Sequence, residues 1–293
     1  MITISLCMIV RDEEDVLARC LDSIRAAADE IIIVDTGSVD HTKEIALRYT
    51  DKVYDFQWCD DFSAARNYAF DKGTMDYLMW LDADDVVLEQ DAEKLLQLKQ
   101  TLSPEVDMVM MPYHVSFDEQ DRPCFTYERE RLIKNGAGLR WRGAVHEAIT
   151  ALGKIVHSNV VIEHRKIKQG DPERNLRIYE KQLAAGVHMG PRERFYYARE
   201  LFYNGRYNEA IKRFENFLDV PGSWLENRID AYRMIAACYD LLNNPDAALH
   251  ALVSSLAEDA PRAETCCDIG RHFIDRKEYK TAGFWYEKAA SRK

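Results

Sequence analysis

The chain has 293 residues, of which 47% are hydrophobic and 30% charged. This is enough apolar material for one or two domains and excludes gross disorder. The formal net charge is −11, so we expect neither a free basic surface nor a nucleic-acid partner. Seven scattered cysteines without CxxC spacing argue against a disulfide framework or a zinc site.

The start of the chain is apolar, but it lacks a positively charged leader and a small-residue cleavage site. We therefore interpret residues 2–10 as a buried strand. No apolar run approaches the roughly 18 residues that a membrane span needs, so no transmembrane segment is expected. Together with the cysteine pattern, these features predict a cytoplasmic protein.

Residues 1 to about 165 alternate strand-like and helix-like segments. Strands are expected at 2–10, 30–35, 52–56 and 77–81, with helices between them at 12–28, 42–49 and 63–71. Alternation at this spacing predicts βαβ units and a mainly parallel sheet. Ligands of such sheets bind beyond the carboxyl ends of the strands, so polar residues at strand ends are the candidates for function.

From about residue 172 onward the chain is typical of an all-helical domain. Residues 204–217 resemble the middle of a tetratricopeptide repeat, and two weaker copies follow. Three matched alanines, Ala210, Ala248 and Ala282, are 38 and 34 residues apart, close to the repeat's period of about 34. Generic amphipathic helices are the alternative interpretation.

The first cluster of polar residues at a strand end begins with Asp35, directly after a β-branched run. Gly37 permits a sharp turn, and Ser38 or Asp40 can cap the next helix. A carboxylate here is suited to accept hydrogen bonds from a ribose or a base. A well-capped turn without a ligand explains the same residues.

The second cluster, Asp82, Asp84 and Asp85, places three carboxylates within four residues after the strand 77–81. Like charges at the edge of a core are unfavourable unless they are neutralised. A hard divalent cation that bridges to phosphate oxygens is the natural partner. A solvated acidic turn before a helix near Asp91 is the alternative.

These motifs together resemble the GT-A fold of family-two glycosyltransferases. The turn 35–38, followed by Asp40 and Thr42, is similar to that family's nucleotide-binding turn, and residues 82–84 to its DxD metal motif. Residues 61–67 resemble a segment common in the branch that carries tetratricopeptide repeats. The peptide S-glycosyltransferases that modify bacteriocins belong to a similar branch.

Two positions depart from the family pattern. An Asn-Glu pair often follows the first strand in the family, whereas this chain has Asp12 and Glu13. His41 stands where glycine is frequent. Both departures affect the expected nucleotide preference and leave the metal motif intact.

The resemblance implies roles for individual residues. Asp84 would ligate Mn²⁺ or Mg²⁺, and Asp82 would contact the ribose or a metal-bound water. Asp35 and Glu13 would hold the nucleoside. Arg66 would lie near the uridine or the diphosphate, or would serve as a structural ion-pair partner.

The catalytic base is expected downstream of the DxD motif. Glu147 is the candidate general base, since a carboxylate near the acceptor needs only a modestly raised pKa. His146 would position the acceptor or a phosphate. His164, at the end of the predicted strand 160–164, would complete the metal shell, as a late histidine does in many GT-A enzymes. A core or surface position is the alternative for each of these residues.

The predicted architecture is therefore an α/β, Rossmann-like GT-A domain at 1–168 and a helical repeat domain at 169–293. The predicted activity is metal-dependent, inverting sugar transfer from a nucleotide-sugar donor, by default a UDP-sugar, to a peptide, protein or glycan acceptor. The repeats would bind the acceptor or form a homodimer. An inactive sugar-nucleotide-binding scaffold is the competing hypothesis.

Overall fold

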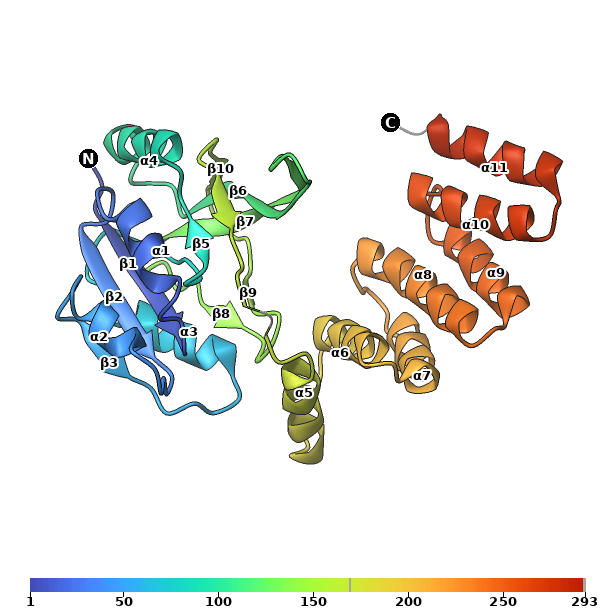
Figure 1. Cartoon of the computed structure of the whole chain (residues 1–293), viewed down its shortest axis with the longest axis horizontal. Helices are drawn as coiled ribbons and strands as arrows, with labels where there is room; N and C mark the ends of the chain where they lie inside the picture. Colours follow the sequence, from blue (N-terminus) through green and yellow to red (C-terminus); the bar gives the residue numbers. More distant parts are fainter. Residues whose placement is uncertain (169, 292–293) are drawn as a thin grey trace. The chain divides into compact units, whose positions relative to one another are not determined.

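The computed structural model describes residues 1–168 and 170–291, and these form two compact units, 1–170 and 171–293 (Figure 1). We expected the domain boundary between residues 168 and 169. Residue 169 lies outside the described residues. Within the described ranges, no helix is both long and apolar enough to cross a membrane.

The N-terminal unit is built on one large mixed sheet with the strand order β3-β2-β1-β4-β7-β6-β11-β5, and β10 pairs with β6. Its strands are β1 (Ile4–Val10), β2 (Glu30–Asp35), β3 (Val53–Asp55), β4 (Tyr77–Met79), β5 (Asp85–Val86), β6 (Met108–Phe117), β7 (Pro123–Lys134), β10 (Ile155–His157) and β11 (Ile162–His164). A separate small sheet pairs β8 (Trp141–Arg142) with β9 (Ala148–Ile149).

The strands β3, β2, β1 and β4 run parallel, as the βαβ pattern predicts. Their carboxyl ends therefore lie along one edge, which holds both predicted clusters of polar residues. β6 and β7 form a long antiparallel hairpin, and β7 also pairs antiparallel with β4. The sheet is consequently mixed.

Four helices accompany this sheet: α1 (Leu17–Ile24), α2 (Thr42–Ala46), α3 (Phe62–Phe70) and α4 (Glu89–Thr101). Alternate residues of β1 enter different core clusters. Leu6 and Met8 pack in the cluster that contains α1 and α4 residues, whereas Cys7 packs with Phe70 of α3. Both faces of the central strand are thus buried, which explains its continuous apolar sequence.

The first helix is shorter than expected, at Leu17–Ile24 instead of 12–28. Asp12 has a φ of 54°, which is incompatible with a right-handed helix. The residues after β1 instead form a loop that bonds to the loop after β2. β4 also ends earlier than expected, at Met79, where its pairing with β1 stops.

The C-terminal unit is all-helical. It contains α5 (Arg174–Ala184), α6 (Pro191–Tyr203), α7 (Tyr207–Leu218), α8 (Leu225–Leu241), α9 (Pro245–Ser254), a 3₁₀ turn at Ser255–Ala257, α10 (Ala263–Asp275) and α11 (Tyr279–Ala290). The helices pack as successive pairs, α6 with α7, α8 with α9 and α10 with α11. The matched residues Ala210, Ala248 and Ala282 are fully buried.

The turns inside the three pairs repeat one another. Gly205, Asn243 and Lys277 all adopt a left-handed conformation, with φ values of 74°, 57° and 62°. After each of them, the next amide donates to the carbonyl five residues earlier, at 2.8–2.9 Å. This is the Schellman end of a helix, and it recurs at spacings of 38 and 34 residues. The repeat interpretation therefore has a backbone basis.

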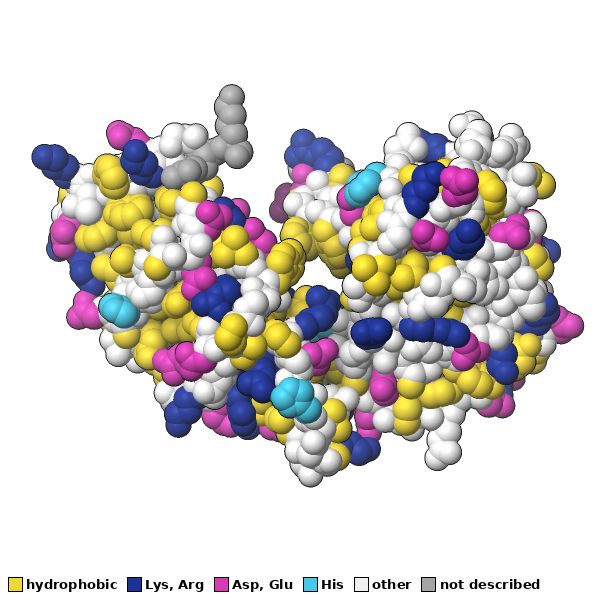
Figure 2. Space-filling model, turned by 180° about the vertical axis from the view of Figure 1, so that it is seen from behind, with side chains coloured by type: hydrophobic (Ala, Val, Ile, Leu, Met, Phe, Trp, Pro, Cys, Tyr) yellow, Lys and Arg dark blue, Asp and Glu magenta, His cyan; other side chains and the backbone are white. Residues whose placement is uncertain are grey.

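Acidic and basic side chains are interspersed over the surface of each unit on the face seen in Figure 2. In the helical unit, many of them form local ion pairs, such as Arg228 with Glu258 at 2.7 Å and Arg233 with Asp268 at 3.0 Å. Residues 171–293 contain 19 acidic and 19 basic side chains, so the formal net charge of −11 lies on residues 1–170.

Candidate active site

The turn after β2 is organised by Asp35. Its carboxylate is 3% exposed and accepts hydrogen bonds from the amides of Gly37 and Ser38, both at 3.1 Å. Gly37 has a φ of 106°, a conformation that favours glycine. The predicted nucleoside contact Asp35 is thus a buried carboxylate that shapes its own turn at the edge of the sheet.

The loop after β1 is bonded to this turn along its length. The amide of Asp12 donates to the hydroxyl of Ser38 at 3.0 Å, and Val39 donates back to the Asp12 carboxylate at 2.8 Å. The amide of Glu13 donates to the Thr42 hydroxyl at 2.7 Å. These reciprocal bonds make the two strand-end loops one unit and fix the backbone that carries the Glu13 side chain.

Glu13 lies in the electrostatic field of the second acidic cluster. Burial and the negative charge of Asp84 raise the pKa of Glu13 to about 7, although Lys168 acts in the opposite direction. Asp82 and Asp40 add smaller effects that also raise this pKa. The carboxylates predicted to hold the nucleoside and the metal therefore repel one another, which a bound cation would relieve.

Arg66, on α3, joins two of the other predicted residues. Its guanidinium is 8% exposed, and it donates to Asp82 at 2.7 Å and to Glu147 at 2.6 Å. It also lies 4.9 Å from the ring centres of Trp80 and Trp141. Asp82, Arg66 and Glu147 are thus brought together from positions 16 and 81 residues apart.

This pairing controls the charge of the DxD motif. Burial alone would raise the pKa of Asp82, but the charge and hydrogen bond of Arg66 lower it overall. The Nη1 atom of Arg66 is buried and has no hydrogen-bond partner in the part of the chain that the structure describes. Arg66 therefore keeps Asp82 ionised and retains one unused donor.

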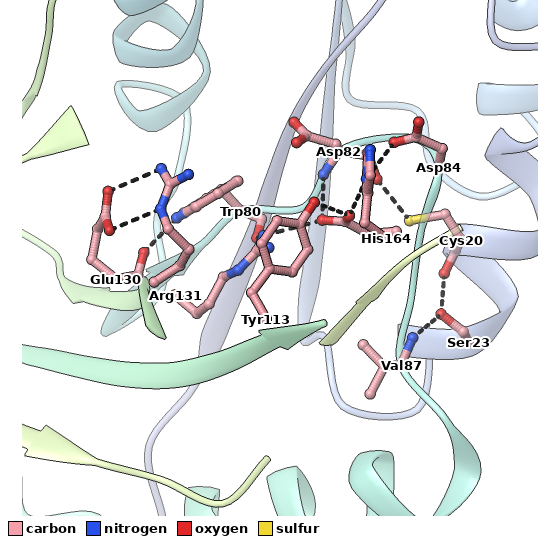
Figure 3. A network of polar contacts seen from close by, with 12 residues as sticks. Cys20, Ser23, Trp80, Asp82, Asp84, Val87, Tyr113, Glu130, Arg131 and His164 are labelled. Carbon is pink, nitrogen blue, oxygen red and sulfur yellow. Dashed lines mark hydrogen bonds and ion pairs between the residues drawn. The ribbon is translucent and has the colours of Figure 1, made fainter. Parts of the chain in front are cut away.

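Asp84 meets a histidine because of strand pairing. β11 runs antiparallel to β5, with His164 opposite Asp85. This register leaves the His164 Nδ1 atom 3.3 Å from Asp84 and 3.2 Å from Asp85 (Figure 3). One ligand atom from each of Asp84, Asp85 and His164 lies within 4.8 Å of the others.

The chemistry of this group fits a divalent cation. Burial and the charges of Asp82 and Asp85 raise the pKa of Asp84, although His164 lowers it. Burial lowers the pKa of His164, but its hydrogen bond to Asp85 and the charges of the surrounding carboxylates raise it overall. Clustered carboxylate oxygens beside an imidazole are ligands that Mn²⁺ and Mg²⁺ accept, with the nitrogen favouring manganese.

The segment that carries the candidate base lies between β8 and β9. The Glu147 side chain is 12% exposed and is held by Arg66. Its neighbour His146 has a φ of 52°, a left-handed conformation that is uncommon for a residue other than glycine and that often marks functional loops. Two basic residues that could offer charge to a diphosphate are already paired, Arg140 with Asp71 at 2.6 Å and Arg165 with Glu163 at 2.7 Å.

Sequence reasoning missed the buried layer beneath the DxD motif. Tyr113 of β6 and Arg131 of β7 both contact Asp85, at 2.7 and 3.1 Å. The sequence contains one signal for Arg131, which is that this charged residue directly precedes the apolar pair Leu132 and Ile133 in a strand-like segment. Nothing local in the sequence identifies its partner.

Residues 5–164 match the model of the family described as Glycosyl transferase family 2. The chain belongs to this family. Its N-terminal unit is a glycosyltransferase domain of the GT-A type, and tetratricopeptide-like repeats follow it.

Three relatives illustrate the range of similar proteins. A TPR repeat-containing protein of Synechococcus elongatus is 40% identical over 51% of this chain and 36% of its own length. The prophage-derived glycosyltransferase SunS of Bacillus subtilis is 24% identical over 91% of this chain and 65% of its own length. The lipopolysaccharide core biosynthesis glycosyltransferase LpsC of Rhizobium meliloti is 23% identical over 71% of this chain and 83% of its own length. The chain thus spans less than two thirds of the first two relatives.

Among solved structures, glucosyl-3-phosphoglycerate synthase from Mycobacterium tuberculosis, in complex with Mn²⁺, UDP-glucose and phosphoglyceric acid, is 21% identical. The match has a TM-score of 0.33 and covers 39% of this chain and 44% of that one.

Proposed function

We propose that this glycosyltransferase transfers a sugar from a UDP-sugar to a peptide, protein or glycan acceptor, depends on Mn²⁺ or Mg²⁺, and inverts the anomeric configuration. The observation that carries the proposal is the approach of His164 to Asp84, whose pKa is raised by burial and by the charges of Asp82 and Asp85. Such an arrangement is unfavourable in isolation and favourable around a cation.

In the proposed site, Asp84 and His164 hold the cation, which when bound offsets charge on the leaving diphosphate. Asp82 contacts the ribose or a metal-bound water, in an orientation fixed by Arg66. Asp35 and Glu13 hold the nucleoside from the two bonded loops.

The transfer forms a bond between the acceptor nucleophile and the anomeric carbon and breaks the bond from that carbon to the diphosphate. Glu147 is the proposed general base that takes the acceptor proton. Its hydrogen bond to Arg66 orients the carboxylate next to Asp82. His146 is proposed to position the acceptor, in keeping with its unusual backbone conformation.

We assign the donor site to residues 1–168 and the acceptor-binding or dimer-forming role to residues 169–293. The compact units at 1–170 and 171–293 support this division. A cytoplasmic location is also proposed, on the scattered spacing of the seven cysteines.

The proposal is tested by UDP release from UDP-glucose or UDP-N-acetylglucosamine in the presence of peptide and glycan acceptor panels. We expect release with Mn²⁺, loss of release with EDTA, and loss in Asp84→Asn. Glu105→Gln, which removes an exposed carboxylate outside the site, is the control and should stay active. NMR of the product should give the anomer opposite to the donor. UDP-sugar binding without turnover on any acceptor would favour the scaffold hypothesis.

A further inference from the structure

Asp85 is fully buried immediately after the DxD motif, and all of its hydrogen-bonding capacity is occupied. Its Oδ1 atom accepts from the Tyr113 hydroxyl at 2.7 Å and lies 3.2 Å from the His164 Nδ1 atom. Its Oδ2 atom accepts from Arg131 at 3.1 Å and from the Asp82 amide at 3.0 Å. A carboxylate offers about four lone-pair sites, so none remains for a cation.

A β-bulge brings Arg131 to this position. The pairing of β6 with β7 moves from Val109 opposite Leu132 to Met110 opposite Glu130, so Arg131 is left out of the register. Bulges re-aim a side chain and are frequent beside active sites. Here the bulge turns a fully buried arginine towards Asp85.

The Arg131 guanidinium is held on several sides. It lies 3.7 Å from the ring centre of Trp80 and 4.3 Å from that of Tyr113. Its Nη1 atom also donates to the carbonyl of Trp80 at 3.1 Å. The buried guanidinium of Arg131 therefore fixes both the Trp80 backbone, just before the DxD motif, and the Asp85 carboxylate, just after it.

The contact with His164 connects this layer to the proposed cation site. A neutral imidazole that donates from Nδ1 presents Nε2 as its only ligating nitrogen, and a carboxylate partner fixes that tautomer and the ring orientation. The Nδ1 atom is also 3.3 Å from Asp84. Asp85 is held in place by Tyr113 and Arg131, whereas Asp84 has neither partner, so Asp85 is the fixed acceptor.

We propose that Asp85 is a positioning residue that orients His164 and the DxD turn, anchored by Arg131 and Tyr113, and is not itself a ligand of the cation. This inference rests on the proposed function, in which Asp84 and His164 bind the cation. In this scheme Asp84 and His164 are ligands of the cation, whereas Asp85 orients His164 without binding the cation.

The experiment measures Mn²⁺ binding to the whole chain by the loss of the free-Mn²⁺ paramagnetic resonance signal. Tyr113→Phe removes the hydroxyl that donates to Asp85 and keeps the ring, which lies edge-on to the His164 ring at 5.8 Å. We expect it to weaken Mn²⁺ binding by up to about 10-fold, the lower end of the cost of losing a direct outer partner such as Asp85. The control is Tyr77→Phe, which removes a buried hydroxyl that donates to the Val106 carbonyl at 2.6 Å elsewhere in the same core. It should bind Mn²⁺ as the wild type does.

A second measurement does not need the metal. Nitrogen NMR of labelled histidines, with His164 identified by its absence in His164→Gln, reports the tautomer above the pH of imidazole titration. We expect Nδ1–H in the wild type and a mixture of tautomers in Asp85→Asn. Unchanged Mn²⁺ affinity in Tyr113→Phe, or an unchanged tautomer in Asp85→Asn, would overturn the inference while leaving the proposed function intact. Failure of the wild type to bind Mn²⁺ would overturn both.

Discussion

The two edges of the parallel strands carry carboxylates in opposite environments. At the start of β2, Glu30 accepts hydrogen bonds from Lys52, Ser5 and Thr74. Burial alone would raise the pKa of Glu30, but these bonds lower it to about 2. Along the edge where β2 ends, Glu13 lies among other acids, and its pKa rises to about 7.

The difference separates a carboxylate that stabilises the fold from one that its acidic neighbours destabilise. A buried acid with a complete set of donors contributes to stability. Clustered acids with raised pKa values reduce stability and are common where function requires them. Three single variants test this contrast, and a double variant tests whether the effect of Arg66→Met comes from its ion pairs.

The largest effect is expected for Arg66→Met, because Arg66, like the donors around Glu30, satisfies carboxylates that are largely withdrawn from water. Its loss leaves Asp82 and Glu147 without their cation. We expect the free energy of unfolding to fall by about 3–5 kcal/mol, the usual cost of breaking a buried pair from one side. Urea unfolding at pH 7 measures it.

A double variant checks that this loss comes from the pairing itself. Glu147→Gln combined with Arg66→Met removes one of the stranded charges. It should recover part of the stability relative to Arg66→Met alone. If the loss in the double variant equals the sum of the losses in Arg66→Met and in Glu147→Gln alone, then Arg66 stabilises the fold through its packing on Trp80 and Trp141 instead.

Glu30→Gln should have the next largest effect. A carboxyl whose pKa falls from 4.5 to about 2 on folding stabilises the native state at pH above 4.5, and this contribution is lost as the pH falls towards 2. We expect a loss of about 2–3 kcal/mol at pH 7 and a much smaller difference from wild type at pH 2.5. UDP binding should not change. An equal loss at both pH values would contradict the assignment.

Glu13→Gln should act in the opposite direction. A carboxyl whose pKa rises from 4.5 to about 7 on folding destabilises the native state increasingly as the pH rises from 4.5, and fully above 7. In the absence of metal, we expect a gain of about 1–2 kcal/mol at pH 8, reduced from the full shift because Glu13 is partly exposed, and none at pH 4. Destabilisation at pH 8 would mean that Glu13 is instead a satisfied structural residue.

Local patterns predicted much of this molecule. The β-branched run at Glu30–Asp35 predicted β2 with the observed bounds, and Asp82 and Asp84 follow a buried strand, so their position at the edge was predictable. The repeat was visible from three buried alanines. Lys277, however, occupies a left-handed turn position with no sequence signal, whereas Gly205 in the matching turn has one.

Contacts that depend on distant pairing were not predictable. Arg131 reaches Asp85 only because of a bulge between β6 and β7, and Arg66 meets Glu147 across 81 residues. Residues 128–131 are all charged, so the sequence does not predict that β7 is buried near its end. Alternation rules cannot anticipate a bulge, because the extra residue changes which face each side chain occupies.

The central claim is that the acids of the functional edge form a cation-dependent donor site. Calorimetric titration with UDP, with and without Mn²⁺, on the wild type and on Asp84→Asn tests it most directly. The account predicts UDP binding that requires Mn²⁺ and falls by 100-fold or more in Asp84→Asn, about 3 kcal/mol. UDP binding of equal strength without Mn²⁺, or unchanged binding in Asp84→Asn, would contradict it.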